Sequence, residues 1–319
     1  MRLTSFFVGL ALALAVNLGG CGDSSTGGGG AGAGPSGGGE GGSGGSPLTG
    51  DPVKIMNWNL HNFFDTQEDP GGEDDSISQN EYTAKLDAVV SVIQALSPDV
   101  IVFCEVENQG ILDDINAALD NVYTESHISE GNDPRSIDIA ALSKFPFTDV
   151  VSHLDETFVV EGTAAPEFEF TRDLLEYHFE VGSQKVALLG VHYKAKGPPD
   201  NPDKRLAEAQ RTRAVADELM AADPSLGVLV LGDYNDLPDS PPLDAVTGSD
   251  PLFVDAASFV AEGDRWSFDF QGSLELIDHQ IGNPVMMSRL DQASVHIEHE
   301  GDVDTASDHH PLIATYYLE

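Results

Sequence analysis

Residues Gly227 to Asp236 read GVLVLGDYND, and this stretch decides the fold. Its first five residues form a short apolar run, which is typical of a strand buried on both faces of a sheet. Asp233 and Asn235 follow at once and are two residues apart, so they face the same way if strand geometry persists. Gly232 lets another backbone approach closely. The stretch therefore predicts a buried strand whose end carries an acid and an amide.

Five other stretches place polar side chains at the end of an apolar strand or at the turn into one. They contribute Asn59, Glu105, His192, Asp278 and the pair Asp308 and His309. Strand ends on one side of a sheet converge, so we expect these groups to share one cleft. Such a set can hold a hard cation and hydrolyse a phosphoester.

Each of these signals has a simpler interpretation when it is taken alone. The stretch from Asp233 is rich in turn formers, Asp308 and His309 could cap a loop, and His192 could be a hydrogen-bonded core histidine. Their joint occurrence at strand ends favours catalysis over these alternatives.

The remaining periodicity places helices between groups of strands. Strands are expected at residues 53–60, 99–106, 137–142, 167–180, 185–193, 227–231, 267–282 and 311–318, and helices at 81–96, 111–119 and 203–222. Strands outnumber helices in this order. The pattern predicts an α/β fold, a four-layer sandwich of two packed mixed sheets flanked by helices.

The first 50 residues differ in composition from the rest. Residues 1–20 read as an export signal, with Arg2 as the only charge and an apolar run from Phe6 to Val16 that is too short to span a bilayer. Residues 18–21 (LGGC) match a lipoprotein cleavage box, which predicts lipidation of Cys21. The alternative is an ordinary signal peptide with a chance cysteine.

Residues 21–50 are mostly Gly, Ser, Ala and Pro, and we interpret them as the lipidated cysteine and a flexible tether. The folded domain is then expected at 51–319. Gly22 lacks an acidic retention signal, so we expect an exported protein anchored by lipid to the bacterial envelope, at the outer membrane. The expected membrane contact is the anchor alone, and the expected state is a monomer without a protein partner.

The chain is strongly acidic, with a formal net charge of −39, which repels nucleic acid at long range. Six of its fifteen basic residues nevertheless fall within twenty positions: Lys194, Lys196, Lys204, Arg205, Arg211 and Arg213. The cluster is a candidate phosphate-facing patch, and the alternative is a solvated helix face. The acidic run 68–75 lacks an EF-hand pattern, which favours a solvated loop over a calcium site.

The order and spacing of the polar stretches resemble the endonuclease/exonuclease/phosphatase superfamily, which is DNase I-like, over about 53–319. Residues 57–65 (NWNLHNFFD), 105–108 (EVEN) and 191–197 (VHYKAKG) are most similar to bacterial secreted nuclease-like members. The resemblance implies a divalent-metal-dependent phosphodiester hydrolase with Mg²⁺ or Mn²⁺ as cofactor.

The resemblance also implies a role for each matching residue. Glu105 would bind the metal, with Asn59 near it and with Asp308 and His61 as further candidates. His61 stands where relatives usually carry an acid, and its imidazole suits Mn²⁺, Zn²⁺ or Fe better than Mg²⁺.

The other implied roles concern the phosphate and the attacking water. His309 would be the catalytic imidazole paired with Asp278, and Asp233 would orient the water. Asn235 would bind the scissile phosphate, and His192 would contact the phosphate or the leaving group. The candidate substrate-phosphate residues are Arg172, Lys194, Lys196 and Arg211.

Three functions follow in order of preference. The first is a surface-anchored nuclease acting on DNA, with the basic cluster along the backbone. The second is a phosphodiesterase or phosphatase on a lipid headgroup or a small phosphoester, which the acidity and the tether favour. The third is a non-catalytic surface binding domain, which the filled functional positions disfavour.

Overall fold

The computed structural model of this chain describes residues 48–67 and 76–319. The expected signal peptide, Cys21 with most of the tether, and the acidic run 68–75 lie outside the described residues. Among the helices of the described part, none is both long and apolar enough to span a membrane.

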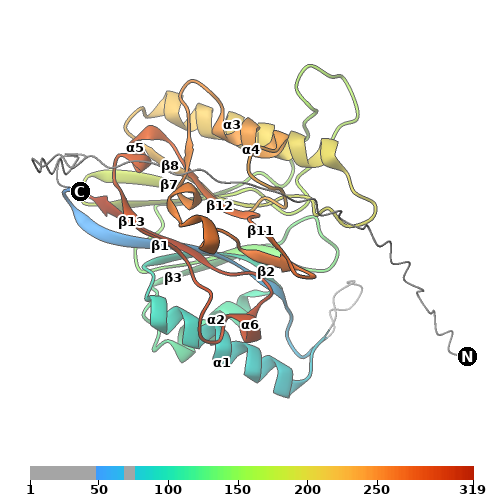
Figure 1. The fold of residues 1–319 in the computed structure, drawn as a ribbon, viewed down its shortest axis with the longest axis vertical. Helices are drawn as coiled ribbons and strands as arrows, with labels where there is room; N and C mark the ends of the chain where they lie inside the picture. The colour runs from blue at the N-terminus through green and yellow to red at the C-terminus, as the bar shows by residue number, and fades with distance from the viewer. Residues whose placement is uncertain (1–47, 68–75) are drawn as a thin grey trace, which may run out of the picture. The chain divides into compact units, whose positions relative to one another are not determined.

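Two six-stranded mixed sheets pack face to face (Figure 1). The first has the order β13 (Leu290–Ile297), β14 (Leu312–Leu318), β1 (Asp51–Phe63), β2 (Val100–Val106), β4 (Asp138–Ser143), β3 (Glu125–Ser129). The second has the order β5 (Asp149–Ser152), β6 (Leu175–Val181), β7 (Gln184–His192), β8 (Gly227–Asp233), β12 (Asp278–Gly282), β9 (Val254–Asp255). β1 runs parallel to β2 and β7 parallel to β8, whereas the other neighbours are antiparallel.

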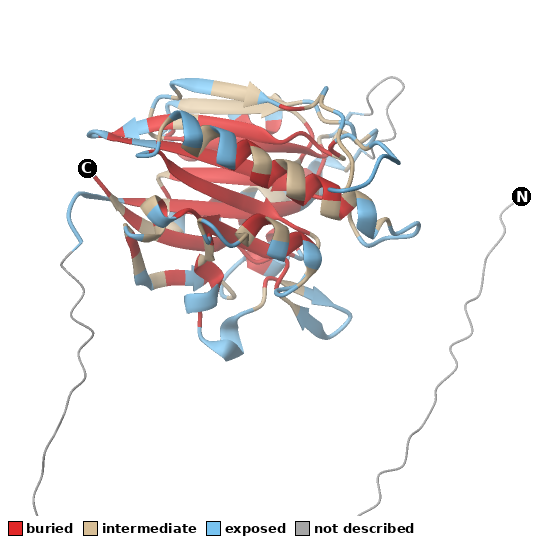
Figure 2. Ribbon diagram, turned by 90° about the horizontal axis from the view of Figure 1, so that it is seen from above, coloured by how far each residue is buried: buried red, intermediate tan, exposed pale blue. Residues whose placement is uncertain are grey.

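Helices cover both outer faces and complete the predicted four layers (Figure 1). The helices of the described residues are α1 (Gln79–Leu96), α2 (Gln109–Ala118), α3 (Pro202–Ala222), α4 (Pro241–Thr247), α5 (Pro284–Met287) and α6 (Val303–Ala306), with 3-10 turns at Ala256–Phe259 and Glu262–Asp264. One apolar cluster lies between the sheets, a second joins the first sheet to α1, α2 and α6, and a third joins the second sheet to α3 and α4. The buried layers form the interior in Figure 2. The predicted fold class is confirmed.

The side chains that face the space between the sheets change from apolar to polar along β1 and β8. In β1, Val53 and Ile55 belong to the core between the sheets, and Asn57 and Asn59 follow them at the same two-residue spacing. In β8, Leu231 is the last apolar residue before Asp233. Each row thus turns polar at the same end of the sandwich, and this end holds the candidate site.

The expected strand 167–180 is wrong in its first half, since only Leu175–Val181 pairs in the sheet. The alternating phenylalanines before it pack within a loop instead. Phe170 packs against Phe158 with ring centroids 4.7 Å apart and the planes tilted by 58°, and Phe168 forms an isolated bridge with Phe158. Alternation here reflects a local aromatic cluster rather than a sheet.

The expected strand 267–282 is divided into two parts. Phe268–Phe270 (β10) and Ser273–Glu275 (β11) form a separate two-stranded hairpin, and only β12 joins the second sheet. The break follows from Gln271 and Gly272, whose φ angles of 54° and 89° make a tight two-residue turn.

Candidate active site

Side chains from both sheets meet at the polar end of the sandwich. Asn59 Nδ2 of β1 lies 3.0 Å from Asp233 Oδ2 of β8 and 3.3 Å from Glu105 Oε1 of β2. His192 Nε2 at the end of β7 lies 3.6 Å from Glu105 and 3.5 Å from Asp233. Four strands therefore bring an amide, two carboxylates and an imidazole together.

A bulge in β2 turns Glu105 into the cleft. Ile101 and Phe103 pack against the helix layer, so regular alternation would send Glu105 to that side as well. Glu105 instead has a φ of 64°, and the pairing of β2 with β4 shifts register between Phe103 and Val106. The backbone N–H of Asn62, itself at a φ of 52°, then donates to Glu105 Oε2 at 2.7 Å. A left-handed backbone conformation costs free energy in residues other than glycine, and here it directs the Glu105 carboxylate into the cleft.

Gly232 permits the close approach that places Asp233. Its φ is 135°, and a Cβ atom at this position would lie 2.1 Å from the Val191 carbonyl oxygen. Asn235 then closes a turn on Asp233, donating its backbone N–H to Oδ1 at 2.7 Å and its side-chain amide to Oδ2 at 3.1 Å. The structure thus brings Asn235 to the same carboxylate that Asn59 contacts.

His309 and Asp278 form a buried pair beside this cluster, with His309 Nδ1 2.7 Å from Asp278 Oδ2. Ser267 Oγ donates to the same oxygen at 2.8 Å. Ser307 Oγ accepts the His309 backbone N–H at 3.0 Å, and Trp58 Nε1 donates to the His309 carbonyl at 2.8 Å. The ring is therefore held in place from both its side chain and its backbone.

Burial and the close carboxylates shift the pKa values of the cleft groups. Burial raises the pKa of Asp233, and the charge of Asp278 raises it further. Burial alone would lower the pKa of His309, but Asp278, with Asp233 and Asp308 behind it, outweighs burial and raises that pKa. Burial, with Arg172 next, holds the pKa of His192 well below its usual range. The cleft thus contains one imidazole that favours a proton and one that does not.

His61 and Asp308 lie at the rim rather than in the buried cluster. Their side chains are 51% and 40% exposed, and His61 Nδ1 lies 3.2 Å from Asp308 Oδ1. The His61 backbone N–H donates to Asn59 Oδ1 at 2.9 Å, which ties the rim to the cluster.

The four candidate phosphate-binding cations occupy different surroundings. Arg172 is 3% exposed, lies 2.9 Å from Asp133 and donates to the Tyr193 carbonyl at 3.2 Å. Lys196 pairs with Asp236 at 3.1 Å. Lys194 forms no ion pair within the described part of the chain, and its Nζ donates to the Ala195 carbonyl.

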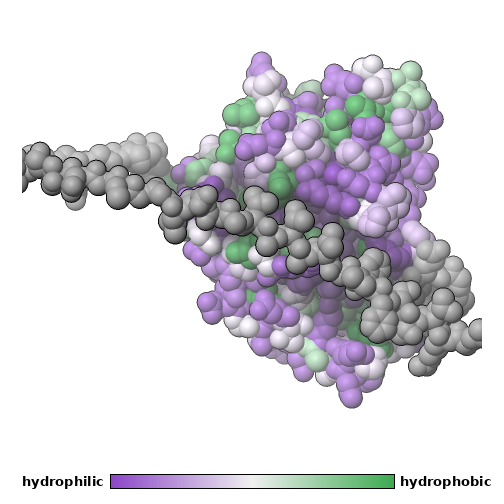
Figure 3. Space-filling model, turned by 45° about the vertical axis from the view of Figure 1, so that its right-hand side comes forward, coloured by the Kyte–Doolittle hydropathy of each residue, from purple (hydrophilic) through white to green (hydrophobic). Residues whose placement is uncertain are grey.

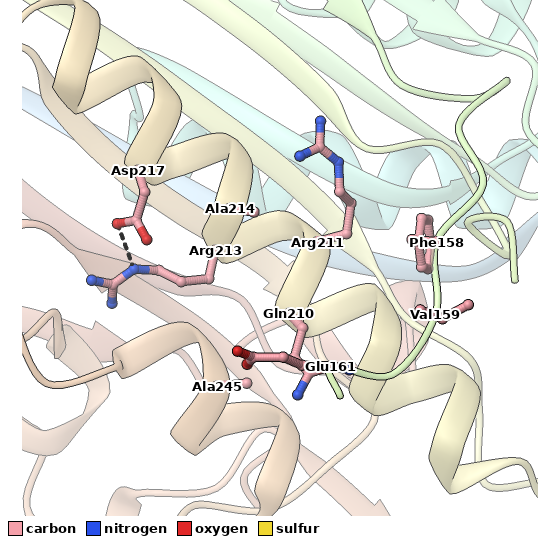
Figure 4. A pocket seen from close by; sticks show the side chains of 9 residues that line it. All are labelled: Phe158, Val159, Glu161, Gln210, Arg211, Arg213, Ala214, Asp217 and Ala245. Atoms are coloured by element: carbon pink, nitrogen blue, oxygen red, sulfur yellow. Dashed lines mark hydrogen bonds and ion pairs between the residues drawn. The ribbon is translucent and has the colours of Figure 1, made fainter. Parts of the chain in front are cut away.

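The structure does not bring Arg211 to the cleft. Its guanidinium contacts both oxygens of Glu156, at 2.6 and 3.1 Å, and Glu218 at 2.8 Å. It lines a cavity of about 490 Å³ on α3 together with Phe158 and Arg213, and no cleft residue lines that cavity (Figure 4). The departure from the expected patch is explained by these two acidic partners, of which Glu156 is 55 residues away in sequence and Glu218 seven.

Several residues around the cleft had no signal in the sequence. Lys85 of α1 donates from Nζ to the His61 carbonyl at 3.0 Å; burial lowers its pKa to about 8, against the pull of Asp308 and Glu105. Arg135, in the loop before β4, is held by Asp133 at 2.9 Å and is close enough to Glu105 for that carboxylate to raise its pKa further. The position of both residues beside the cleft depends on tertiary packing, which no local sequence pattern predicts.

The architecture and the cleft together define a class, the metal-dependent phosphoesterases with a DNase I-like sandwich. The model of the endonuclease/exonuclease/phosphatase family matches residues 54–291. This chain belongs to the endonuclease/exonuclease/phosphatase family, and it is a phosphodiester hydrolase of that divalent-metal-dependent family. No curated protein sequence matches the chain significantly.

Solved structures share the fold at low identity. Truncated TDP2 of Caenorhabditis elegans is 20% identical with a TM-score of 0.57, covering 85% of this chain and 99% of that one. The human nocturnin catalytic domain with bound sulfate is 13% identical with a TM-score of 0.60, covering 84% and 95%. TDP2 of D. rerio complexed with single-strand DNA product is 16% identical with a TM-score of 0.56, covering 83% and 98%.

The cleft fits the divalent cation that the family requires. Its donors are carboxylates, which suit hard cations, and ligand atoms of Asp233, Asp278 and His309 lie within 4.8 Å of one another. Asp278 Oδ1 is buried and has no hydrogen-bond partner among the described residues. A buried unpaired carboxylate oxygen is costly, and a cation would satisfy it.

We expect the residue at position 61 to set the metal preference. The change His61→Asp adds an anionic oxygen donor at the rim, so the ratio of Mg²⁺-supported to Mn²⁺-supported activity should rise several-fold. Aspartate tolerates the φ of 48° at this position, so the backbone should be retained. The measurement is turnover of one diester substrate across a metal series.

The matched control is His61→Asn, which also tolerates a left-handed backbone but adds no charge. This variant should leave the ratio near that of the wild type. An unchanged ratio in His61→Asp would show that position 61 is only a wall of the cleft.

Proposed function

We propose that this chain is an exported, lipid-anchored nuclease of the bacterial envelope that hydrolyses DNA with Mg²⁺ or Mn²⁺. One observation carries the proposal: Glu105, Asp233 and the Asp278–His309 pair converge where the two sheets open. A carboxylate cluster beside a fixed imidazole is what hydrolysis of a phosphodiester requires.

The proposed division of labour follows the contacts. Glu105, with Asn59 and rim residues Asp308 and His61, would hold the cation, which supplies neutralisation of phosphate charge when bound. We assign His309 to proton chemistry because the contact of Nδ1 with Asp278 fixes the tautomer and leaves Nε2 to exchange a proton.

The attacking water and the phosphate have their own groups. Asp233 would orient the water, and the amide of Asn235 on the same carboxylate would bind a phosphate oxygen. His192 would contact the phosphate or the leaving group from the end of β7. Arg172 is buried, so we assign it to positioning of this segment through the Tyr193 carbonyl, which Asn235 Nδ2 also contacts at 3.1 Å.

One further observation supports DNA over a lipid headgroup. The D. rerio TDP2 that shares the fold was solved with a single-strand DNA product.

The direct test offers purified protein three substrates: plasmid DNA, sphingomyelin vesicles and bis-p-nitrophenyl phosphate, each with Mg²⁺, Mn²⁺ or EDTA. We expect cleavage of DNA that EDTA abolishes. Hydrolysis of sphingomyelin without nicking of the plasmid would refute the nuclease proposal in favour of activity on a lipid headgroup. The net charge of −39 and a membrane tether would agree with that activity.

Two lysines of the basic cluster should matter for polymeric DNA. Lys194 and Lys204 form no ion pair within the described residues, and they lie close enough for Lys204 to lower the pKa of Lys194, after burial and Arg172. Replacing both with alanine should weaken DNA cleavage about tenfold. The slope of the logarithm of activity against the logarithm of salt concentration should become shallower by the contribution of up to two phosphate contacts. The measurement is cleavage rate against salt concentration.

Arg211→Ala is the matched control, because its charge is already neutralised by Glu156 and Glu218. It should leave the salt slope of the wild type. Equal slopes for all three proteins would refute the role of the two lysines.

A further inference from the structure

The β10–β11 hairpin places an aromatic ring against the imidazole of the active site. Phe268 forms an isolated antiparallel bridge with His309, and their ring centroids are 4.8 Å apart at an interplanar angle of 36°. The His310 backbone N–H also donates to the Ser267 carbonyl at 2.8 Å. Backbone and ring contacts together join the hairpin to the cleft.

A second ring extends this surface outward. Phe270 lies two residues further on, so it shares the face of Phe268. The two ring centroids are 6.3 Å apart and the planes differ by 25°. Phe270 is 55% exposed, although large aromatic side chains are mostly buried in this domain. We call Phe268 and Phe270 the aromatic ledge, which leads from His309 to solvent.

The other exposed apolar side chain of the hairpin points the opposite way. Leu274 pairs with Asp269, whereas Phe270 pairs with Ser273. Neighbouring positions on a strand face opposite sides, so Leu274, which is 54% exposed, lies on the face away from the ledge. The hairpin therefore lacks a joint apolar face, which insertion into a lipid surface would need.

The surroundings indicate a neutral planar occupant. The molecule carries a net charge of −39, and the part of the domain surface that Figure 3 leaves uncovered is mostly hydrophilic. A further anion on the ledge would meet this charge and the Glu275 carboxylate, which shares the ledge's face of the hairpin. A nucleobase carries no charge and presents a π-face that stacks on exposed aromatic rings.

We propose that Phe270 is a stacking platform for a nucleobase of the substrate, close to the scissile phosphate. The proposal rests on the nuclease function above and deepens it, since it makes the base as well as the phosphate part of what is recognised. Stacking is tolerant of sequence, so the ledge would favour nucleic acid as a class rather than a particular base. Phe268, held by the bridge to His309, would set the position of the platform relative to the imidazole.

The test compares Phe270→Ala with the matched control Leu274→Ala, an equally exposed residue on the other face. The substrates are a twelve-residue oligothymidylate and a backbone-only oligomer of the same length whose sugars carry no base. In Phe270→Ala we expect the KM for oligothymidylate to rise about tenfold at nearly constant kcat, because a ground-state contact is lost. The KM for the backbone-only oligomer should change less than twofold, and Phe270→Trp should restore oligothymidylate binding.

Other outcomes overturn the inference. An unchanged KM for oligothymidylate in Phe270→Ala would exclude stacking, and equal losses in Phe270→Ala and Leu274→Ala would indicate a general structural role of the hairpin. If the wild type cleaves neither oligomer yet hydrolyses another phosphoester, the proposed nuclease function itself fails. Cleavage by the wild type without an effect of Phe270 refutes the ledge alone.

Discussion

Replacing Glu105 with glutamine should reduce metal-dependent turnover by about 10³-fold while the domain stays folded. The amide keeps the shape of the side chain and retains one oxygen to accept the Asn62 N–H. It loses the negative charge that would hold a cation, and a catalytic cation contributes several kcal/mol of transition-state stabilisation. The measurement is the rate on plasmid DNA and on bis-p-nitrophenyl phosphate at saturating Mn²⁺.

Two controls separate loss of metal from loss of fold. Glu180→Gln removes a charge from an exposed glutamate of β6 and should keep full activity. The Tm of Glu105→Gln should stay near that of the wild type in EDTA but should rise less when Mn²⁺ is added, because a ligand stabilises only the protein that binds it. Near-normal turnover by Glu105→Gln would refute its role as a ligand.

The sequence indicated much of the frame of this molecule. The apolar runs that end in Asn59, His192 and Asp233 do form strands, β1 in the first sheet and the neighbouring β7 and β8 in the second. The structure gathers these residues at one end of the sandwich. Helix α1 begins at Gln79, with Ser78 as its N-cap and a capping box to Glu81, close to the expected start at residue 81. Continuous apolar runs and strand-end polarity are local signals, and the runs coincide with strands here because both faces of each sheet are buried.

The sequence could not indicate the finer arrangement of the cleft. Alternation in β2 predicts that Glu105 faces the helices, and only the bulge at a φ of 64° reverses this. A bulge depends on the pairing of β2 with its neighbour β4, so no single strand encodes it. The basic cluster failed as a unit for a related reason: Arg211 meets Glu156, which lies 55 residues earlier in the chain.

Strand β13 and the hairpin were also beyond local patterns. β13 is half exposed, with Gln292 and Ala293 open to solvent, so its apolar signal is weak. In the hairpin, the alternation of Phe268 and Phe270 does reflect a strand, but this strand, β10, pairs with β11 across the turn rather than with the second sheet. A pattern in the sequence indicates that a strand exists, and tertiary packing decides which strand it joins.

The last expected result concerns the Asp278–His309 pair. His309→Ala should reduce the rate of diester hydrolysis by about 10³-fold, within the range for loss of an acid/base group. Asp278→Asn should cost a comparable factor, because Asp278 Oδ2 fixes the imidazole through a 2.7 Å contact. If Asp278 acts only through His309, the double variant should be no slower than His309→Ala alone, since residues that act as a unit are non-additive.

The alternative is a metal cluster of Asp233, Asp278 and His309, in which Asp278 would hold the cation directly. In that case the Mn²⁺ concentration needed for half-maximal rate would rise in Asp278→Asn, whereas an imidazole partner would leave it unchanged. The exposed His296 of β13, whose side chain is 51% accessible, supplies the control, and His296→Ala should keep the wild-type rate. A raised Mn²⁺ requirement in Asp278→Asn would show that Asp278 also holds the cation and would refute a role through His309 alone.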